Sequence, residues 1–362
     1  IWIYFFWEIT TVCSFLLIGY TKTKEAVNNS FTSLLMNSIG GLCFAIAIVI
    51  LRLEFNIFDL KALSDCKLIN SNLILAILLI AIAALSKSAQ LPFSKWILGA
   101  MVAPTPTSAL LHSSTMVKAG VYLLIRLAPV LAGNISGEMV TLVGGLTFLI
   151  TSFIAISQSD TKKVLAYSTM SNLGLIVACA GIGTYESIWA AILLLIFHSV
   201  SKSLMFLSVG AIEHIIGSRD IEDMHGLIIR LPEMTLIMVI GIAGMFLAPF
   251  GMLISKWAAL KAFVDSGQVI IVVALAYGSA ATLFYWTKWL GKLTAIRHKW
   301  ERKKCTVKKE EWEALILQAI ITVSLCVLYP IVSKVLIIPF IFEMFNITEV
   351  NLISNINQTL LP

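Results

Sequence analysis

The sequence contains few charged residues and none of the short motifs that mark common soluble enzymes. Charged residues make up 13% of the chain. A soluble domain carries about a quarter. There is no Gly-rich phosphate loop, no GxSxG nucleophile motif and no HExxH metal motif. Chemistry of these three kinds is therefore poorly supported.

The six cysteines form no recognisable ligand set. They include no CxxC pair and no His/Cys spacing typical of a metal site. Most of them lie in apolar runs, where a cysteine usually acts as a small packing residue. We therefore expect no metal ion, iron–sulfur cluster or haem on this chain.

Long apolar runs dominate the 362 residues, 59% of which are hydrophobic. Runs of roughly 20 apolar residues predict membrane-spanning helices, so we expect an all-α polytopic membrane protein. Because the chain begins at Ile1 inside an apolar run, we expect it to be N-terminally incomplete. The predicted spans, about ten in number, are 1–20, 31–51, 71–100, 104–129, 137–157, 161–182, 186–214, 234–265, 268–291 and 313–343.

Two of these spans carry a proline near the middle. Pro92 follows Lys87 in the span 71–100, and Pro249 lies in the span 234–265. Proline removes a backbone donor, and in a bilayer the freed groups need protein or water in a cavity. Paired broken helices in corresponding halves of a transporter are the best sequence indicator of an ion path.

The connections between the predicted spans alternate between two sets, one rich and one poor in basic residues. The rich set holds sixteen lysines and arginines and the poor set holds four. The positive-inside rule places the rich set, which includes Lys162 and Lys163, in the cytoplasm and the C-terminus outside. The formal net charge of +6 comes mainly from the loop 292–312 and implies no nucleic-acid partner. We interpret this loop as solvated, with a lipid-headgroup or partner surface as the alternative. The connector 219–224 is interpreted as a docking or structural loop.

A set of titratable residues lies inside the predicted spans, where charge is costly and usually functional. His198 and Lys202 are four residues apart and share a helix face, whereas Lys118 follows His112 by six residues and does not. Stepwise proton transfer needs such a row of groups that can lose and regain a proton. The predicted proton path comprises Glu8, Lys87, His112, Lys118, His198, Lys202 and Lys256.

Each member also has a structural interpretation. An intramembrane histidine can be a hydrogen-bonded packing residue, and a lysine can be half of an inert ion pair. A membrane anchor with paired, inert charges is therefore an alternative. Four lysines and a glutamate in about ten spans argue against a purely structural role. Gly144 and Gly145 indicate close helix packing.

Several long motifs resemble the antiporter-like subunits of respiratory complex I (NADH dehydrogenase subunit 5-like). That family is shared with Mrp cation/proton antiporters and membrane subunits of energy-converting hydrogenases. The similarity extends over essentially the whole chain. The motifs are Trp7-Glu8, Cys13–Gly19, Ser86–Phe93, Ala103–Pro106, Leu111–Leu123, Asp160–Thr169 and Phe197–Lys202.

The resemblance implies two inverted five-helix repeats, the first one incomplete, with two broken helices at Pro92 and Pro249. The family often has another histidine at the position of Leu194, so linkage there would rely on water. The implied divisions are 1–129 (last four helices of the first repeat), 137–291 (second repeat), 292–312 (basic cytoplasmic loop), 313–343 (final helix) and 344–362 (tail).

The resemblance also implies a role for each path residue. Glu8 and Lys87 would form the glutamate–lysine pair of the first half-channel. Lys256 would gate the exit half. The remaining four would connect the halves: His112 and Lys118 bridging inward, and His198 and Lys202 at the centre.

The expected function is that of a non-redox, proton-translocating membrane subunit of an oxidoreductase complex, either NADH:quinone oxidoreductase-like or membrane-bound hydrogenase-like. Partner membrane and peripheral subunits would then carry iron–sulfur clusters with a flavin or NiFe centre. The alternatives are an Mrp-type Na⁺/H⁺ antiporter subunit and a structural anchor. The connector 216–224 and the spacing of His198 and Lys202 look most similar to the hydrogenase-type or archaeal/bacterial branch of the family. The expected location is a prokaryotic cell membrane, with the mitochondrial inner membrane as the alternative.

Overall fold

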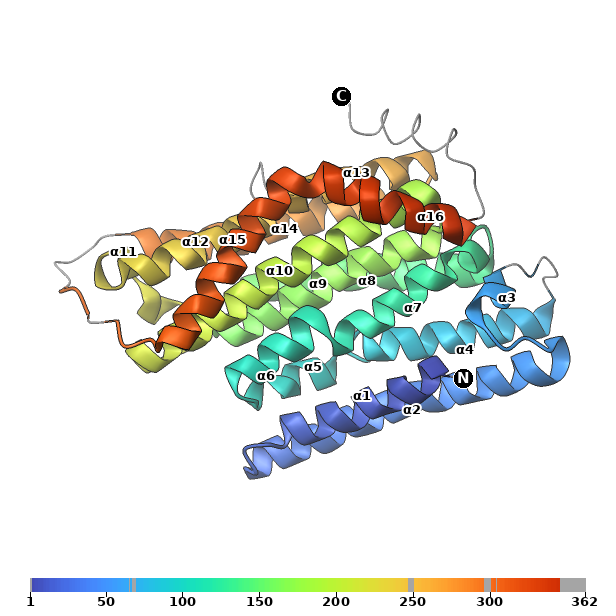
Figure 1. Ribbon diagram of the computed structural model, residues 1–362, viewed down its shortest axis with the longest axis horizontal. Helices are drawn as coiled ribbons and strands as arrows, with labels where there is room; N and C mark the ends of the chain where they lie inside the picture. The colour runs from blue at the N-terminus through green and yellow to red at the C-terminus, as the bar shows by residue number, and fades with distance from the viewer. Residues whose placement is uncertain are drawn as a thin grey trace.

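The helices run roughly side by side, and most of their connections gather at the two ends of an elongated bundle (Figure 1). The computed structural model describes residues 2–64, 66, 70–246, 251–295, 301–303 and 305–345. Within these residues the secondary structure is helical, apart from an isolated β-bridge between Asp160 and Asp220. The predicted all-α class is confirmed.

The helices fall into long apolar ones and short connecting ones. The long α-helices are α1 (Trp2–Ile18), α2 (Lys24–Phe55), α4 (Ser71–Lys87), α7 (Met116–Leu131), α8 (Ile135–Ile156), α9 (Thr161–Ile182), α10 (Tyr185–Ile216), α12 (Pro232–Phe246), α13 (Gly251–Asp265), α14 (Val269–Thr294) and α15 (Lys309–Val332). The short elements are α3 (Leu60–Ser64), α5 (Lys95–Gly99), η1 (Ala100–Val102), α6 (Thr105–Ala109), η2 (Leu110–Ser114), η3 (Glu222–Met224), α11 (Leu227–Arg230), η4 (Ser333–Ile337) and α16 (Ile338–Phe345).

Among the described residues, eight helical segments are long and apolar enough to cross a membrane, and the shorter apolar helices α1 and α4 accompany them. They correspond to the predicted spans, so the polytopic membrane class is confirmed. Helix α9 lies in the middle, with 89% of its most apolar window buried by protein. The outer helix α2 exposes Leu35, Leu42 and Val49, seven residues apart along one face, as a lipid-facing helix should.

Several helices begin at a polar residue that caps the first turn. Each side chain accepts a hydrogen bond from a backbone N–H two or three residues later, which satisfies a donor that would otherwise have no partner. At α9, for example, the Asp160 carboxylate accepts from the Lys163 N–H at 3.0 Å. The other caps of this kind are Thr23, Asn70, Asn134 and Thr184.

Helices α8 and α9 pack closely at Gly144. A Cβ atom at this position would lie 2.5 Å from both the Ala178 nitrogen and the Gly174 carbonyl oxygen. Only a glycine lets the two backbones approach this far. The predicted close packing at Gly144 is confirmed, and it fixes α9 in the centre of the bundle.

The first predicted break is present. Helix α4 ends at Lys87, and the chain turns through Pro92 before α5 begins. In the turn the Leu91 N–H donates to the Thr147 hydroxyl at 3.2 Å, so the protein satisfies a backbone group freed by the break. The break therefore leaves Lys87 at the end of a helix inside the protein.

The second predicted break, at Pro249, lies outside the described residues, between the end of α12 and the start of α13. A different interruption occurs in the segment 104–129. Here η2 is a π-helical turn that contains His112, and Thr115 has non-helical dihedral angles (φ −114°, ψ −89°). Single π-turns inside α-helices occur frequently at functional sites.

The division into two inverted repeats, 1–129 and 137–291, stays a prediction. The final predicted span, 313–343, corresponds to α15, η4 and α16 in succession. Residues 296–300 and 304 of the loop 292–312 and nearly all of the tail 344–362 lie outside the described residues.

Candidate functional site

All seven predicted path residues lie in the described part of the chain. Six of them, all except Glu8, are buried, and Glu8 is half-buried. They come from six elements: α1 (Glu8), α4 (Lys87), η2 (His112), α7 (Lys118), α10 (His198 and Lys202) and α13 (Lys256). The row thus crosses much of the bundle.

The closest contact in the set joins α7 to α10. Nζ of Lys118 lies 2.7 Å from Nδ1 of His198, and both side chains are buried. An ammonium group and an imidazolium ring have only N–H donors. A hydrogen bond between these two atoms therefore requires one of them to be unprotonated. The pair holds at most one of the two possible positive charges at a time.

Lys202 lies one turn beyond His198 on α10 and faces α9. Its Nζ donates to the Leu165 carbonyl at 3.0 Å and to the Ser168 hydroxyl, and it lies 5.2 Å from the Trp286 ring centroid. Carbonyl and hydroxyl oxygens together with a ring face can stabilise a buried ammonium group. The same hydroxyl can also donate to an uncharged amine, because it is both donor and acceptor.

His112 sits in the π-turn η2 and is fully buried. Its ring lies 5.2 Å from that of Phe206 on α10. Within the described residues neither ring nitrogen has a hydrogen-bond partner. Phe206 and His198 are eight residues apart on α10, so η2 and α7 both lie along this helix. The π-turn thus brings His112 and Lys118 to one neighbour, although the spacing of six predicts different faces.

The first half of the predicted path lies between α1 and α4. Nζ of Lys87 donates to the Trp7 carbonyl at 3.0 Å and to the Thr11 hydroxyl at 2.7 Å. Among the described residues no ion pair within 4 Å joins Lys87 to Glu8. The Oε1 atom of Glu8 is buried without a hydrogen-bond partner there. The predicted glutamate and lysine therefore share one helix neighbourhood without direct pairing.

Lys256 stands apart from the central group. It lies on α13, and its Nζ is 5.8 Å from the ring centroid of Phe148 on α8. It lines a hollow of about 350 Å³ between α13 and α14, together with Trp257, Ser279 and Thr282. This lysine therefore borders a space large enough for water.

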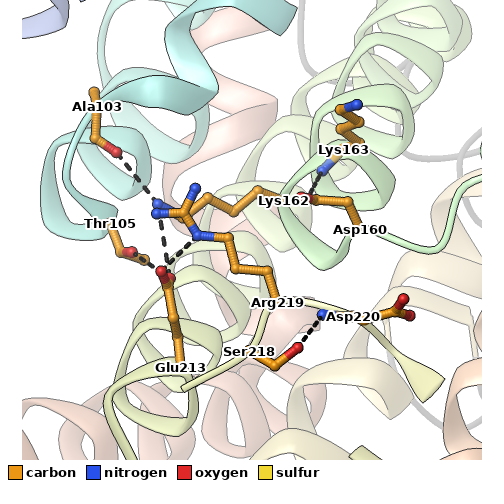
Figure 2. A network of polar contacts seen from close by, with 9 residues as sticks. All are labelled: Ala103, Thr105, Asp160, Lys162, Lys163, Glu213, Ser218, Arg219 and Asp220. Atoms are coloured by element: carbon orange, nitrogen blue, oxygen red, sulfur yellow. Dashed lines mark hydrogen bonds and ion pairs between the residues drawn. The ribbon is translucent and has the colours of Figure 1, made fainter. Parts of the chain in front are cut away.

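A polar network that the sequence interpretation missed lies at one end of α9 and α10 (Figure 2). The loop count includes Lys162 among the charges of a connection, but the residue is in the first turn of α9 and its side chain is 1% exposed. Its Nζ donates to the Ala103 carbonyl at 3.2 Å and lies 3.9 Å from Oε2 of Glu213. The Glu213 carboxylate also binds Arg219.

One signal in the sequence could have revealed Glu213. It follows Lys202 by eleven residues on the same helix, which is about three turns, so both lie on one face. Lys162 gives a similar signal, because Leu165, whose carbonyl accepts from Lys202, follows it by three residues on α9.

The connector 219–224 is held against neighbouring elements outside the spans. The Thr161 N–H donates to the Arg219 carbonyl, and the Ile221 N–H to the Ser159 carbonyl, both at 2.9 Å. Lys292 binds the Glu222 carboxylate, and this contact holds the pKa of Glu222 below its ordinary value. These contacts favour the structural interpretation of the connector.

The chain matches a known family over residues 1–283, described as "NADH:quinone oxidoreductase/Mrp antiporter, TM". Two curated relatives are the proteins named "Putative antiporter subunit mnhA2" of Staphylococcus aureus strains MRSA252 and JH9. They are 36% and 37% identical over 310 residues, which is 78% of this chain. The chain spans 39% of the length of these relatives.

Two solved structures have a similar fold. A chain of the Mrp complex from Dietzia sp. DQ12-45-1b has a TM-score of 0.76 and 30% identity, covering 89% of this chain and 36% of its own. A chain of the membrane-bound sulfane sulfur reductase, an archaeal respiratory membrane complex, has a TM-score of 0.85 over 99% of this chain and 73% of its own. At 21% identity the latter similarity shows the fold alone.

The family match covers more than three quarters of the chain and the predicted resemblance is confirmed. The chain belongs to the NADH:quinone oxidoreductase/Mrp antiporter transmembrane family, as an antiporter-like membrane subunit.

Proposed function

We propose that this chain conducts protons along its buried row as the ion-translocating part of a cation/proton antiporter complex of the Mrp type. The observation that carries the proposal is the 2.7 Å contact between Lys118 and His198, with Lys202 one turn away. A buried pair that holds at most one charge can pass a proton between its members without either group moving far.

The central step is a proton exchange between neighbours. When Lys118 is an ammonium group, it donates to the unprotonated Nδ1 of His198. When Lys118 is neutral, it accepts from Nδ1–H. Positive charge on Lys202 repels a second charge on Lys118, because at short range in a medium of low dielectric constant like charges interact strongly. Protons would therefore move along the row one at a time.

Water would link the members that do not touch. Buried polar atoms usually have a protein or ordered-water partner. Along the row several such atoms lack a protein partner within the described residues: Glu8 Oε1, Trp7 Nε1, both nitrogens of His112, His198 Nε2, Asn172 Oδ1 and the Tyr285 hydroxyl. They are the natural binding points for a chain of water molecules, which would also cover the position of Leu194.

Lys87 and Lys256 would serve the two ends of this path. Lys87 is held by a carbonyl and a hydroxyl, both of which stay in place when it loses its proton. Glu8 would act on Lys87 through its charge. Lys256 borders a hollow of about 350 Å³, which offers it room for water. These are the roles that the resemblance implies for them.

The antiporter assignment rests on the named relatives. The curated relatives carry the name of an antiporter subunit, and the solved structure that is 30% identical belongs to an Mrp complex. The complete protein would then work with further membrane subunits in a prokaryotic cell membrane and exchange Na⁺ or another cation for H⁺.

A redox-driven complex is the second candidate, because the family description also names NADH:quinone oxidoreductase and one similar fold comes from a respiratory complex. In that case partner subunits would supply the iron–sulfur clusters and a flavin or NiFe centre. Cation-induced proton movement in vesicles without an electron donor distinguishes the two, since only the antiporter requires no donor.

The test of proton conduction uses Lys202→Met in membrane vesicles that contain the complete complex. We expect cation-induced collapse of an imposed pH gradient to slow roughly 100-fold or more, as for loss of a proton-transferring group. The matched control is Lys163→Met, at an exposed lysine of α9. Normal collapse in Lys202→Met vesicles with wild-type amounts of complex would contradict the proposal and favour the structural anchor.

A further inference from the structure

The carboxylate of Glu213 lies between two cations of different accessibility (Figure 2). On one side is Arg219, whose side chain is 41% exposed, and on the other is Lys162, at 1%. The Glu213 side chain itself is 22% exposed. The three residues thus form a ladder from the surface to the interior, in which only the carboxylate contacts both sides.

The two oxygens of this carboxylate are held differently. Oε1 is 2.5 Å from Nε of Arg219. Oε2 is 3.9 Å from Nζ of Lys162 and 3.5 Å from the Thr105 hydroxyl. A good hydrogen bond to an oxygen is about 2.7–3.2 Å long. The outer oxygen is therefore firmly bound, while the inner one makes only long contacts, which Lys162 can shorten by approaching it.

The inner end of the ladder continues into the proposed proton path. Lys162 stands one turn before Leu165 on the face of α9 that holds Lys202. The π-turn η2 that carries His112 packs against both α9 and α10. Lys162 therefore lies on the same helix interface as the central lysine, toward the membrane surface.

A hollow at the surface lies beside the ladder, on the side of Thr105. A hollow of about 260 Å³ between α6, α10 and α15 extends to Thr105, whose hydroxyl contacts Glu213. Its rim carries His214, Glu310 and Glu311. These side chains are exposed, and acidic groups at a mouth attract cations. The hollow therefore offers room for water beside Thr105, one contact away from the inner oxygen of Glu213.

We propose that Glu213 and Lys162 form a proton gate between the surface hollow at Thr105 and the buried row at His112 and Lys202. The gate rests on the proposed function, because it needs a conducting row to serve. It lies at the end of the bundle that the basic-residue bias predicts to be cytoplasmic, and protons pass through it in either direction.

The transfer is balanced in charge and protons. A proton from the hollow binds Oε2 of Glu213, which weakens its attraction to Arg219. The protonated carboxyl group gives this proton to a neutral Lys162 amine, directly or through one water molecule. The carboxylate is then restored and pairs again with Arg219, and the Lys162 ammonium passes the proton inward. The reverse order releases a proton.

The same ion pairs could merely tie α9 and α10 to the connector, so the test must separate proton transfer from assembly. Glu213→Gln keeps the shape and an oxygen that accepts from Arg219, but it cannot take up a proton. We expect cation-induced collapse of a pH gradient in vesicles with the complete complex to slow roughly 100-fold, with unchanged amounts of complex. Glu213→Asp should restore much of the rate.

The matched control is Glu233→Gln, because Glu233 is likewise paired to an arginine, Arg302, outside the ladder. The pH gradient should collapse at the wild-type rate in Glu233→Gln. A wild-type rate in Glu213→Gln, or equal rates in the Gln and Asp variants, would overturn the gate. If Glu213→Gln does not assemble, Lys162→Met decides, since Glu213 then keeps Arg219: a slow rate supports the gate and a wild-type rate overturns it.

The Lys202→Met result separates this proposal from the proposed function. If Lys202→Met conducts normally, the conducting row itself is wrong. If Lys202→Met is inactive while Glu213→Gln conducts at the wild-type rate, the row stands and only the gate fails.

Discussion

Lys118 and His198 are eighty residues apart in the sequence and share a buried contact of 2.7 Å between Nζ and Nδ1. The contact places α7 against the middle of α10. His198, Lys202 and Glu213 occupy one face of α10, since they follow one another at four and eleven residues. Helix α10 therefore carries the central part of the row, and its neighbours supply the partners.

The Lys118–His198 contact predicts that the two residues act as one unit. We expect Lys118→Met and His198→Phe each to remove most of the proton movement, and the double variant to be no slower than either single one. Independent sites would multiply their effects. The measurement is the collapse rate of a pH gradient in vesicles. Ser199→Ala, at a half-buried neighbour that donates to the Leu195 carbonyl, is the control.

If the rate losses of the two single variants multiply in the double variant, this coupling is contradicted.

The stability of the complex gives a second observation on the same pair. Each single substitution leaves a buried polar atom without its partner, which costs about 1–3 kcal/mol. Replacing both should cost less than the sum, as measured by thermal unfolding of the complex in detergent.

The Thr11 hydroxyl is predicted to affect the rate at which protons move through Lys87. It accepts from Nζ at 2.7 Å, and Thr11→Val removes this oxygen while keeping the shape of the side chain. A hydrogen bond to a charged group contributes about 1.5–3 kcal/mol, so proton movement should slow about tenfold or more. Thr10→Val is the matched control, because the Thr10 hydroxyl donates to the Trp7 carbonyl at 2.7 Å without contacting Lys87. Equal rates in the two variants would argue against this role.

The contact between Glu222 and Lys292 predicts a loss of local stability in acid. Lys292 holds the pKa of Glu222 below its ordinary value, so the contact stabilises the fold fully above that value, about 4.3. The contribution falls as the pH drops toward the lower pKa of the folded state. Because the Glu222 side chain is 52% exposed, the effect is small and confined to the connector.

Hydrogen exchange at the Gly226 amide, which donates to the Lys292 carbonyl at 3.0 Å, measures this loss. Protection of this amide should decrease as the pH falls below about 4.3, after correction for the intrinsic exchange rate. In Glu222→Gln, protection should be lower at neutral pH and should not change over this range. Identical pH profiles for the two proteins would refute the prediction.

Residue spacing in the sequence predicted which residues form the buried row, but not which of them touch. Apolar run lengths gave the spans, and Pro92 gave the break after Lys87. The spacing of His112 and Lys118 did not predict that both residues contact α10, because it assumes an uninterrupted α-helix. The π-turn η2 and the non-helical Thr115 change the rotation between the two residues.

The sequence by itself determined the membrane class, the central lysines and histidines, and the family, because apolar runs and intramembrane charges are local properties of the chain. Only the tertiary structure decided that Lys118 contacts His198, that Lys87 binds Thr11 in place of Glu8, and that Lys162 is buried beside Glu213. These relations depend on which helix faces meet, and packing between distant segments sets them.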